Sequence, residues 1–420
     1  MVDHVFTGFG FGPIQAGLFV SEAFSSGNFR RIVIAEIVDE LVEAVRANGG
    51  SYYVNVAATD GVKVMQVDNV ELINPKTDRE KLVAVLGEST EIVTSLPSVD
   101  FYSAGGDNSV AALISQGLSA SSAKGSIIYA AENNNHAAEV LCEVVKPGDN
   151  KNVQFLNTVI GKMSRVVTDA AEIAELKLKP IAPGIDRAFL VEEFNKILVT
   201  KCALAGFSPG IEVFIEKQDL LPFEEAKLYG HNAIHALLAY LGIAKGYEKM
   251  TDMKDDSALM TIARNAFLNE SGGALIKKNA HLNDELFTRA GFKEYTDDLL
   301  ERMTNPYLQD TTDRAGRDPV RKLGIGDRIF GTMNLAIDQG IEPANMACAA
   351  AAGVRYLLNN TQEYNVPENL SGIDVQRPSA DNIRDILLWL WSRADQKEQQ
   401  HSAEIIELTR RAYLKLPELL

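Results

Sequence analysis

The sequence has little of what disulfide-linked, sulfur-ligated and membrane-spanning proteins need. Its three cysteines, Cys142, Cys202 and Cys348, are far apart and form no Cys-x-x-Cys pair. This spacing argues against a disulfide framework and a sulfur-ligated metal site, and it fits a reducing cytosol. The apolar stretch at residues 5–20 has no basic segment before it, is broken by glycines and a proline, and is too short to span a bilayer. We therefore expect a cytoplasmic protein without a membrane segment.

Basic residues are also fewer than acidic residues. The chain has 41 Lys and Arg against 57 Asp and Glu, which gives a net charge of −16. This charge would repel a polyanion, so we expect no nucleic-acid partner. With 420 residues, 46% of them hydrophobic, the chain can build two or three domains, each with its own core.

The first recognisable unit is a strand, a glycine-rich turn and a helix. Residues 2–7 are strand-like, residues 8–13 read Gly-Phe-Gly-Phe-Gly-Pro, and a helical pattern follows. Glycines let such a turn tighten and let the backbone approach a pyrophosphate at the helix N-terminus. Pro13 takes the place of the third glycine of this fingerprint, which is tolerable in a first helical turn. We predict that a dinucleotide contacts four residues of the turn, Gly8, Gly10, Phe11 and Gly12.

An acidic residue closes the second strand-like run. Residues 31–35 are rich in β-branched side chains and end at Glu36. A carboxylate there can accept hydrogen bonds from both ribose hydroxyls and would repel a 2′-phosphate. The pattern therefore favours NAD over NADP. The alternative is that Glu36 only caps the helix expected at residues 39–48.

Strand-like and helical patterns then alternate. Strand-like runs are at residues 82–86, 92–95, 126–130 and 153–156, and helical patterns are at residues 109–117 and 136–144. Such alternation predicts an α/β fold, a Rossmann-type doubly wound sheet. Ligands bind at the carboxyl ends of its strands, where Thr94 and Asn133 would lie, and we expect Thr94 to contact the cofactor. Beyond this region the pattern is helical, so we predict a dinucleotide-binding domain at residues 1–190 and a helical substrate-binding and catalytic domain at residues 191–420.

The segment Lys-Leu-Tyr-Gly-His-Asn-Ala-Ile-His at residues 227–235 carries two incompatible interpretations. At about 100° per residue of α-helix, its polar side chains share one face. His231 and His235 have the spacing of two zinc ligands, but a zinc protease has glutamate where this chain has Asn232, which cannot accept a proton. No later histidine has a suitable spacing for a third ligand, so a metal site is the minor alternative.

The second interpretation is a metal-free acid/base set. Oxidation of a secondary alcohol by NAD needs a base for the hydroxyl proton and donors for the developing alkoxide. Lys227 can be that base if desolvation and a neighbouring nicotinamide cation lower its pKa. Asn232 and His235 would donate to the reacting oxygen. The alternative is a solvated Lys227 and a core histidine at position 235.

Residues 227–242 resemble the catalytic signature of the polyol-specific long-chain dehydrogenases, a family that includes mannitol-1-phosphate 5-dehydrogenases, mannitol dehydrogenases and hexuronate reductases. The resemblance continues at residues 131–133, 191–194, 305–308 and 313–323. It implies a metal-independent, NAD-dependent oxidoreductase. The implied catalytic residues are Lys227 as general base, with Asn232 and His235 polarising the reacting oxygen. The implied substrate-binding residues are Asn133, Arg314 and Lys322.

Two departures from the family pattern leave the substrate open. Gly161 stands where members have a substrate-binding aspartate, and His231 is unusual within the signature. Four cations, Arg314, Arg317, Arg321 and Lys322, lie within nine residues.

These four cations suit a phosphate or carboxylate pocket. The alternative is a solvated helix face paired with the neighbouring aspartates, Asp310, Asp313 and Asp318. We expect the interconversion of a polyol phosphate of the mannitol 1-phosphate class with its ketose phosphate. A hexuronate reductase and a non-catalytic NAD-binding homologue are the alternatives, and the oligomeric state stays open.

Overall fold

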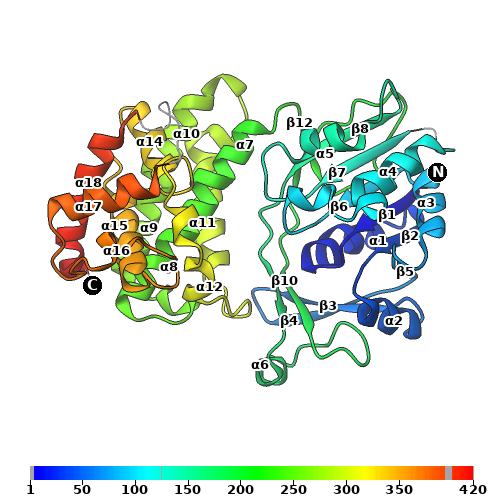
Figure 1. The fold of residues 1–420 in the computed structure, drawn as a ribbon, viewed down its shortest axis with the longest axis horizontal. Helices are drawn as coiled ribbons and strands as arrows, with labels where there is room; N and C mark the ends of the chain where they lie inside the picture. The colour runs from blue at the N-terminus through cyan, green and yellow to red at the C-terminus, as the bar shows by residue number, and fades with distance from the viewer. Residues whose placement is uncertain (1–3, 124, 393–399, 420) are drawn as a thin grey trace. The chain divides into compact units, whose positions relative to one another are not determined.

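The computed structural model describes residues 4–123, 125–392 and 400–419. By its internal contacts the chain divides into two compact units, Met1–Phe223 and Glu224–Leu420 (Figure 1). The predicted boundary at residue 190 falls within strand β10 (Ala188–Glu192), which pairs with other strands of the first unit. Residues 2 and 3 of the first predicted strand lie outside the described residues.

The first unit is built on a doubly wound sheet, as predicted. Its strand order is β12-β11-β8-β7-β6-β1-β2-β5, and the strands from β8 to β5 are parallel. The bounds are β1 (His4–Phe9), β2 (Phe29–Ala35), β5 (Val70–Ile73), β6 (Glu91–Thr94), β7 (Ser126–Ala130), β8 (Val153–Val159), β11 (Leu198–Thr200) and β12 (Ile215–Lys217). Because side chains alternate along a strand, Phe6 enters the core on one face while Val5 and Phe9 enter the core on the other.

The helices of this unit are α1 (Ser21–Ser26), α2 (Asp39–Ala47), α3 (Arg79–Glu88), α4 (Val110–Ser119) and α5 (Ala137–Val145). The strand predicted at residues 82–86 is wrong, because these residues lie in α3. Leu82, Val85 and Leu86 are buried at helical spacing, i, i+3 and i+4. A short apolar run cannot be assigned to a strand or a buried helix by periodicity alone.

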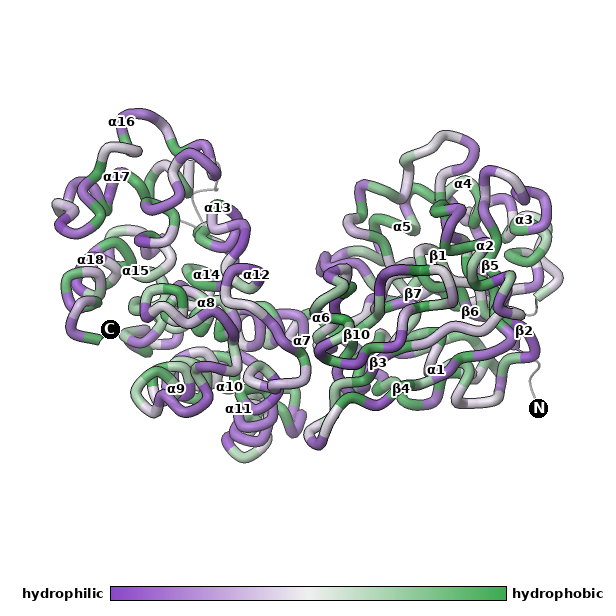
Figure 2. The backbone as a smooth tube through the Cα atoms, turned by 90° about the horizontal axis from the view of Figure 1, so that it is seen from below, coloured by the Kyte–Doolittle hydropathy of each residue, from purple (hydrophilic) through white to green (hydrophobic). Residues whose placement is uncertain are grey.

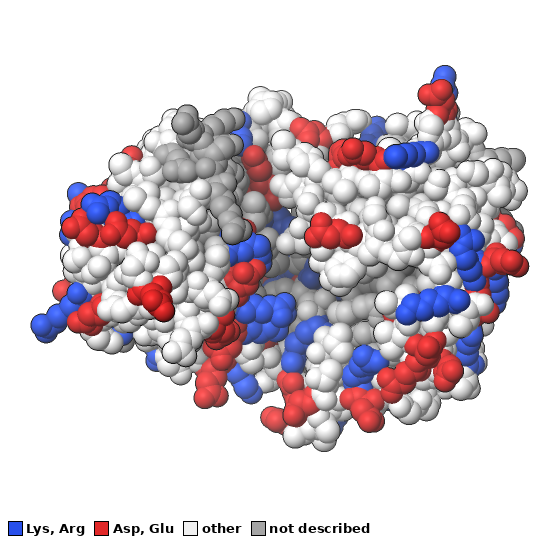
Figure 3. Space-filling view, in the orientation of Figure 1, with Lys and Arg blue, Asp and Glu red and all other residues white. Residues whose placement is uncertain are grey.

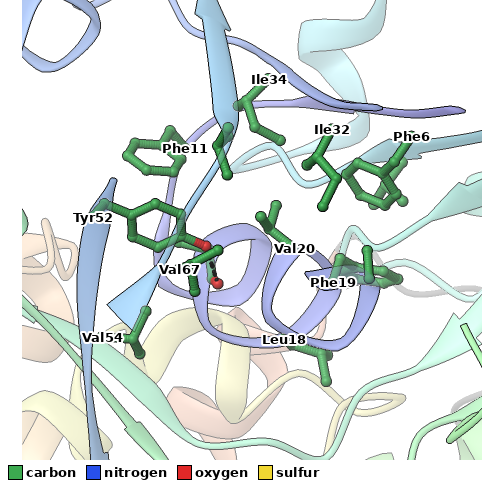
Figure 4. Close-up of a cluster of buried hydrophobic side chains, with 14 of the residues drawn as sticks. Phe6, Phe11, Leu18, Phe19, Val20, Ile32, Ile34, Tyr52, Val54 and Val67 are labelled. Atoms are coloured by element: carbon green, nitrogen blue, oxygen red, sulfur yellow. Dashed lines mark hydrogen bonds between the residues drawn. The ribbon is translucent and has the colours of Figure 1, made fainter. Parts of the chain in front are cut away.

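A second, four-stranded sheet was not expected from the sequence. Its order is β4-β3-β10-β9, with β3 at Tyr52–Ala57, β4 at Val62–Val67 and β9 at Ser164–Val167. It packs on the helical turns that follow β1, where the Tyr52 hydroxyl donates to the Ala16 carbonyl at 2.7 Å (Figure 4). The approach is close, since a Cβ on Gly17 would lie 2.6 Å from Val191 Cγ1.

The second unit is helical, which agrees with the prediction for this part of the chain. Its longer helices are α8 (Ala233–Lys245), α9 (Ser257–Asn265), α11 (Arg289–Met303), α14 (Phe330–Asp338), α15 (Ala344–Asn359), α17 (Ala380–Leu390) and α18 (Ser402–Leu419). Helix α15 packs against α8 and α18. The helices carry both hydrophobic and hydrophilic residues (Figure 2), as expected when one face of each is buried. Among the described residues, no helix is both long enough and apolar enough to cross a membrane.

Candidate active-site residues in the two units

The glycine turn begins two residues later than the sequence predicted. Pairing of β1 with β2 and β6 continues through Phe9, so Gly8 lies in the strand. The turn itself contains Gly10, whose φ is +84°, and Gly12. A Cβ on Gly10 would lie 2.8 Å from the Ser95 carbonyl oxygen, whereas a Cβ on Gly12 would enter open space.

The third position of the fingerprint is therefore Gln15 and not Pro13. Gln15 is fully buried, and a Cβ on Gly8 would overlap its amide nitrogen. Gly8 thus permits close packing of helix and strand, which is the role the fingerprint gives to its third glycine. Gly10 and Gly12 leave room for a ligand to approach the backbone.

Glu36 follows β2 and organises this turn. Its carboxylate is buried and accepts three backbone N–H groups: Phe11 at 2.8 Å, Ile37 at 2.8 Å and Val38 at 2.9 Å. A carboxylate offers about four acceptor positions, so about one remains for a ligand hydroxyl. Contact of Glu36 with both ribose hydroxyls remains a prediction, and it would require that one backbone contact be given up.

Thr94 is the last residue of β6, and its side chain makes its hydrogen bond within the protein. It is fully buried and donates to Glu132 at 2.9 Å. The same carboxylate accepts the Leu96 N–H at 2.9 Å and the Tyr102 hydroxyl, and burial raises its pKa. Thr94 and Glu132 therefore fix the loops after β6 and β7, and a direct cofactor contact by Thr94 stays a prediction.

The two other positions noted in this unit lie in connections after strands. Asn133 is exposed in the turn after β7. Gly161 lies between β8 and β9 beside Lys162, whose ammonium donates to the Phe194 carbonyl at 2.7 Å. Contact of Asn133 with a substrate remains a prediction.

In the second unit, Lys227–Asn232 is a π-helical turn that continues into α8. A π-helix bonds residue i to i+5, so residues five apart lie one turn apart. The α-helical angles assumed above therefore do not apply between these residues. Lys227 and Asn232, five apart, still share a face, and π-turns of this kind are frequent at functional sites.

Lys227 is half-buried at the start of this turn. Its pKa is lowered to about 8, first by burial and then by the charge of Arg328, against an opposing effect of the Glu224 carboxylate. A lysine in this range exchanges a proton near neutral pH, which an ordinary lysine with a pKa of about 10.4 does not. This observation favours the interpretation of Lys227 as a base over that of a solvated residue.

His231 is buried one helical turn beyond the lysine. Its pKa lies well below the usual histidine value because of burial and then because of the surrounding cations, Arg302 first among them. The side chain is therefore neutral. Its ring meets that of His235 edge to face, with centroids 6.4 Å apart.

His235 is held by an aspartate that the sequence had suggested only as a partner for nearby cations. Its Nε2 lies 3.0 Å from Asp310 Oδ2, and Asp310 Oδ1 accepts the Arg314 Nε–H at 2.6 Å. Burial raises the pKa of Asp310, but the hydrogen bonds and charges of His235 and Arg314 outweigh it and hold that pKa well below its usual range. The carboxylate is thus ionised and bridges two predicted site residues.

The four clustered cations have different surroundings. Lys322 is buried, donates to the Ala315 carbonyl at 2.5 Å, and has its pKa lowered to about 7 by burial. Arg321 pairs with Asp318 and Asp327, at 2.6 and 3.4 Å. The guanidinium of Arg317 is exposed and, within the described part of the chain, has no hydrogen bond or ion pair.

A fifth cation, Arg328, was missed by the sequence analysis. It is buried and bonds Asp327 through Nε at 2.8 Å. Its charge lowers the pKa values of Lys227, His231 and Lys322. It lies outside the recognised motifs, so only the fold reveals its effect on these groups.

The described residues contain no cluster of three or more His, Cys, Asp or Glu side chains placed to hold a metal ion. In addition, one ring nitrogen of His235, Nε2, faces Asp310. Metal independence remains a prediction.

The sequence of this chain is similar to those of known proteins. Residues 219–412 match the model of the mannitol dehydrogenase C-terminal domain. The chain is 27% identical to a mannitol-1-phosphate 5-dehydrogenase of Halalkalibacterium halodurans over 84% of this chain and 89% of that protein. It is 29% identical to one of Aureobasidium melanogenum over 77% of this chain and 78% of that protein.

Two solved structures share the fold. One is a substrate-free D-sorbitol dehydrogenase, with a TM-score of 0.78 and 16% identity over 99% of this chain and 94% of that one. The other is the Pseudomonas fluorescens mannitol 2-dehydrogenase in ternary complex with NAD and D-mannitol, with a TM-score of 0.69 and 16% identity over 99% and 92%. At this identity the likeness establishes the fold alone.

Proposed function

We propose that this chain, whose residues 219–412 match the mannitol dehydrogenase C-terminal domain, is a member of the mannitol dehydrogenase-like family and an NAD-dependent oxidoreductase that interconverts a polyol phosphate of the mannitol 1-phosphate class and its ketose phosphate. The observation that carries the proposal is Lys227, a lysine with a pKa of about 8 on the same face of a π-turn as Asn232. The relatives of this chain that are named mannitol-1-phosphate 5-dehydrogenases support the substrate class.

The residues of the first unit fit a dinucleotide. The turn at Gly10 and Gly12 offers free space beside its backbone, and the helix that follows presents its N-terminus. The Glu36 carboxylate keeps an acceptor position for a ribose hydroxyl and a negative charge that disfavours a 2′-phosphate. These residues would hold NAD, which when bound accepts or supplies the hydride.

Proton transfer falls to the second unit. In alcohol oxidation, neutral Lys227 takes the hydroxyl proton as the carbon loses its hydride. In carbonyl reduction, protonated Lys227 returns that proton to the oxygen. Asn232 donates a hydrogen bond to the same oxygen, and its amide makes no bond to another described residue. His235 contacts the oxygen or the adjacent hydroxyl.

Among the four clustered cations, Arg317 is the best candidate to bind the phosphate of the substrate. Arg314, Arg321 and Lys322 already have partners within the protein, whereas the Arg317 guanidinium is exposed and unpaired among the described residues. A guanidinium can bind phosphate through two parallel N–H donors. We therefore assign the phosphate contact to Arg317, while Arg314 and Lys322 stay predicted substrate-binding residues and the two Nη groups of Arg314 can meet substrate hydroxyls.

A reduction assay tests the proposal. NADH and NADPH would each be offered with fructose 6-phosphate, fructose, tagaturonate and fructuronate while the absorbance of the reduced nicotinamide is followed. We expect turnover with NADH and the phosphate ester, undiminished after treatment with a chelator. Reduction of a uronate would indicate a hexuronate reductase, and tight NADH binding without turnover would indicate a non-catalytic homologue.

A further inference from the structure

Asp310 lies between two residues of the proposed site and contacts both with different oxygens. Oδ2 faces His235 Nε2 at 3.0 Å, and Oδ1 accepts from Arg314 Nε at 2.6 Å. The aspartate is buried, with 6% of its surface exposed. Its backbone is also fixed, because its carbonyl accepts the Met250 N–H at 2.9 Å. The carboxylate therefore has one defined position.

An ionised carboxylate can only accept hydrogen bonds, so the proton of this contact must belong to His235 Nε2. A neutral imidazole carries one proton. With Nε2 protonated, Nδ1 bears a lone pair, and it has no hydrogen-bond partner among the described residues. The nitrogen left for a ligand is then an acceptor in the neutral ring, and becomes a donor only in the imidazolium.

From this geometry we infer that Asp310 is a positioning residue, which fixes His235 as the Nε2–H tautomer and presents Nδ1 to the substrate. The assignment rests on the proposed function in one respect, the contact of His235 with substrate. It divides the work between the polar groups: with Nδ1 unprotonated, His235 accepts a hydrogen bond from a substrate hydroxyl, while Asn232 donates to the reacting oxygen and Lys227 exchanges the proton. Asp310 also holds Arg314 through Nε, and the two Nη groups of Arg314 make no hydrogen bond to another described residue.

Asp310→Asn is a sharp test, because asparagine has the same shape but a different donor pattern. Its oxygen can still accept from Arg314 Nε, whereas its amide nitrogen must donate toward His235 Nε2. His235 Nε2 would then have to be unprotonated, and the proton of the ring would move to Nδ1. A wrong tautomer of this kind costs much more activity than loss of a simple contact.

The tautomer can be read directly by ¹⁵N NMR of histidine-labelled protein, with the His235 signals assigned by their loss in His235→Gln. The chain offers a matched control in His401, whose Nε2 lies 2.7 Å from Asp338 in another part of the same unit. Asp338→Asn alters an equivalent contact outside the proposed site. It should leave both the His235 tautomer and the activity unchanged.

We expect His235 to carry its proton on Nε2 in the wild type and on Nδ1 in Asp310→Asn. We also expect kcat/KM of Asp310→Asn to be at least about 10-fold lower than that of the wild type, the size of effect seen when a supporting partner is lost. Nδ1–H in the wild type would overturn the inference, whether or not the enzyme turns over any substrate tried. A changed tautomer with unchanged kcat/KM would overturn the catalytic part. Failure of the proposed reaction alone would leave the wild-type tautomer measurement intact.

Discussion

At the scale of single residues, the proposed proton transfer depends on the surroundings of Lys227. Burial and Arg328 lower its pKa to about 8. The neutral form is needed to accept the hydroxyl proton of an alcohol, and the protonated form is needed to donate to a carbonyl. The lowered pKa places both forms within reach near neutral pH.

The pH dependence of the two directions follows from this value. For oxidation, kcat/KM should rise about tenfold per pH unit below pH 8 and level off above it, because only neutral Lys227 accepts a proton. For reduction, the profile should be flat below pH 8 and fall above it. Initial rates across the pH range measure both. Lys322, whose pKa is about 7, provides the control. If Lys322→Met shifted the change in kcat/KM near pH 8, the assignment of that change to Lys227 would be wrong.

Glu36 has a second role that changes how its substitution must be interpreted. Glu36→Ala removes a charge near the expected ribose and also leaves three backbone N–H groups without their acceptor. We expect a lower melting temperature, at least about 10-fold weaker NADH binding, and a smaller preference for NADH over NADPH, since a buried unsatisfied donor costs about 1–3 kcal/mol. Calorimetric titration with both nucleotides and a thermal melt test this. Unchanged NADH affinity would contradict the assignment of Glu36 to the nucleotide site.

Sequence spacing could propose Lys227, Asn232 and His235 as candidate catalytic residues, because they lie within nine consecutive residues and resemble a family signature. It could not identify Asp310 as the partner of His235, because 75 residues separate them. Nor could it identify Arg328, whose importance is electrostatic and follows from burial beside Lys227. Contacts between segments far apart in the chain come from the fold and not from a local pattern.

At the scale of elements, two local structures hold most of the proposed cofactor-binding and catalytic residues. One is the strand-turn-helix unit around Gly10, and the other is the π-turn at Lys227–Asn232. The sequence predicted the first unit but placed its turn two residues too early, since strand propensity does not show where pairing stops. It gave no sign of the π-turn or of the second sheet, which depend on packing against other elements.

The two glycines of the turn should respond differently to alanine. Gly10→Ala should destabilise the protein by about 1–3 kcal/mol, because of the positive φ and the contact with the Ser95 carbonyl. Gly12→Ala should leave stability within about 0.5 kcal/mol, since its Cβ meets open space.

Gly12→Ala should nevertheless weaken NADH binding, because that open space is where a pyrophosphate would approach the backbone. Denaturant unfolding and NADH titration of both variants separate these effects. A Gly12→Ala protein that binds NADH as tightly as the wild type would show that the nucleotide does not use this turn.

At the scale of the whole molecule, a net charge of −16 contrasts with a substrate expected to be anionic. Acidic and basic side chains are interspersed on the face drawn in Figure 3. Recognition of a phosphate therefore needs local cations rather than the overall field. Of the four clustered cations, Arg317 is the one whose guanidinium has no partner in the described part of the protein.

Arg317→Ala should raise the KM for the phosphate ester about 10- to 100-fold, the equivalent of about 1.5–3 kcal/mol for charged hydrogen bonds. The KM for the unphosphorylated ketose should not change. Arg411→Ala, which removes another exposed arginine of the same unit, is the matched control. Equal effects of Arg317→Ala on both substrates would rule out a phosphate contact at this residue.

Nucleotide binding is proposed for residues of the first unit and proton transfer for Lys227 in the second, so one variant should separate the two properties. Lys227→Ala is the most direct measurement, with Lys278→Ala, an exposed lysine paired with Glu225, as the control. We predict that Lys227→Ala lowers kcat by about 10²- to 10⁴-fold, while NADH binds with unchanged Kd and Lys278→Ala behaves as the wild type. Wild-type turnover by Lys227→Ala would contradict the account.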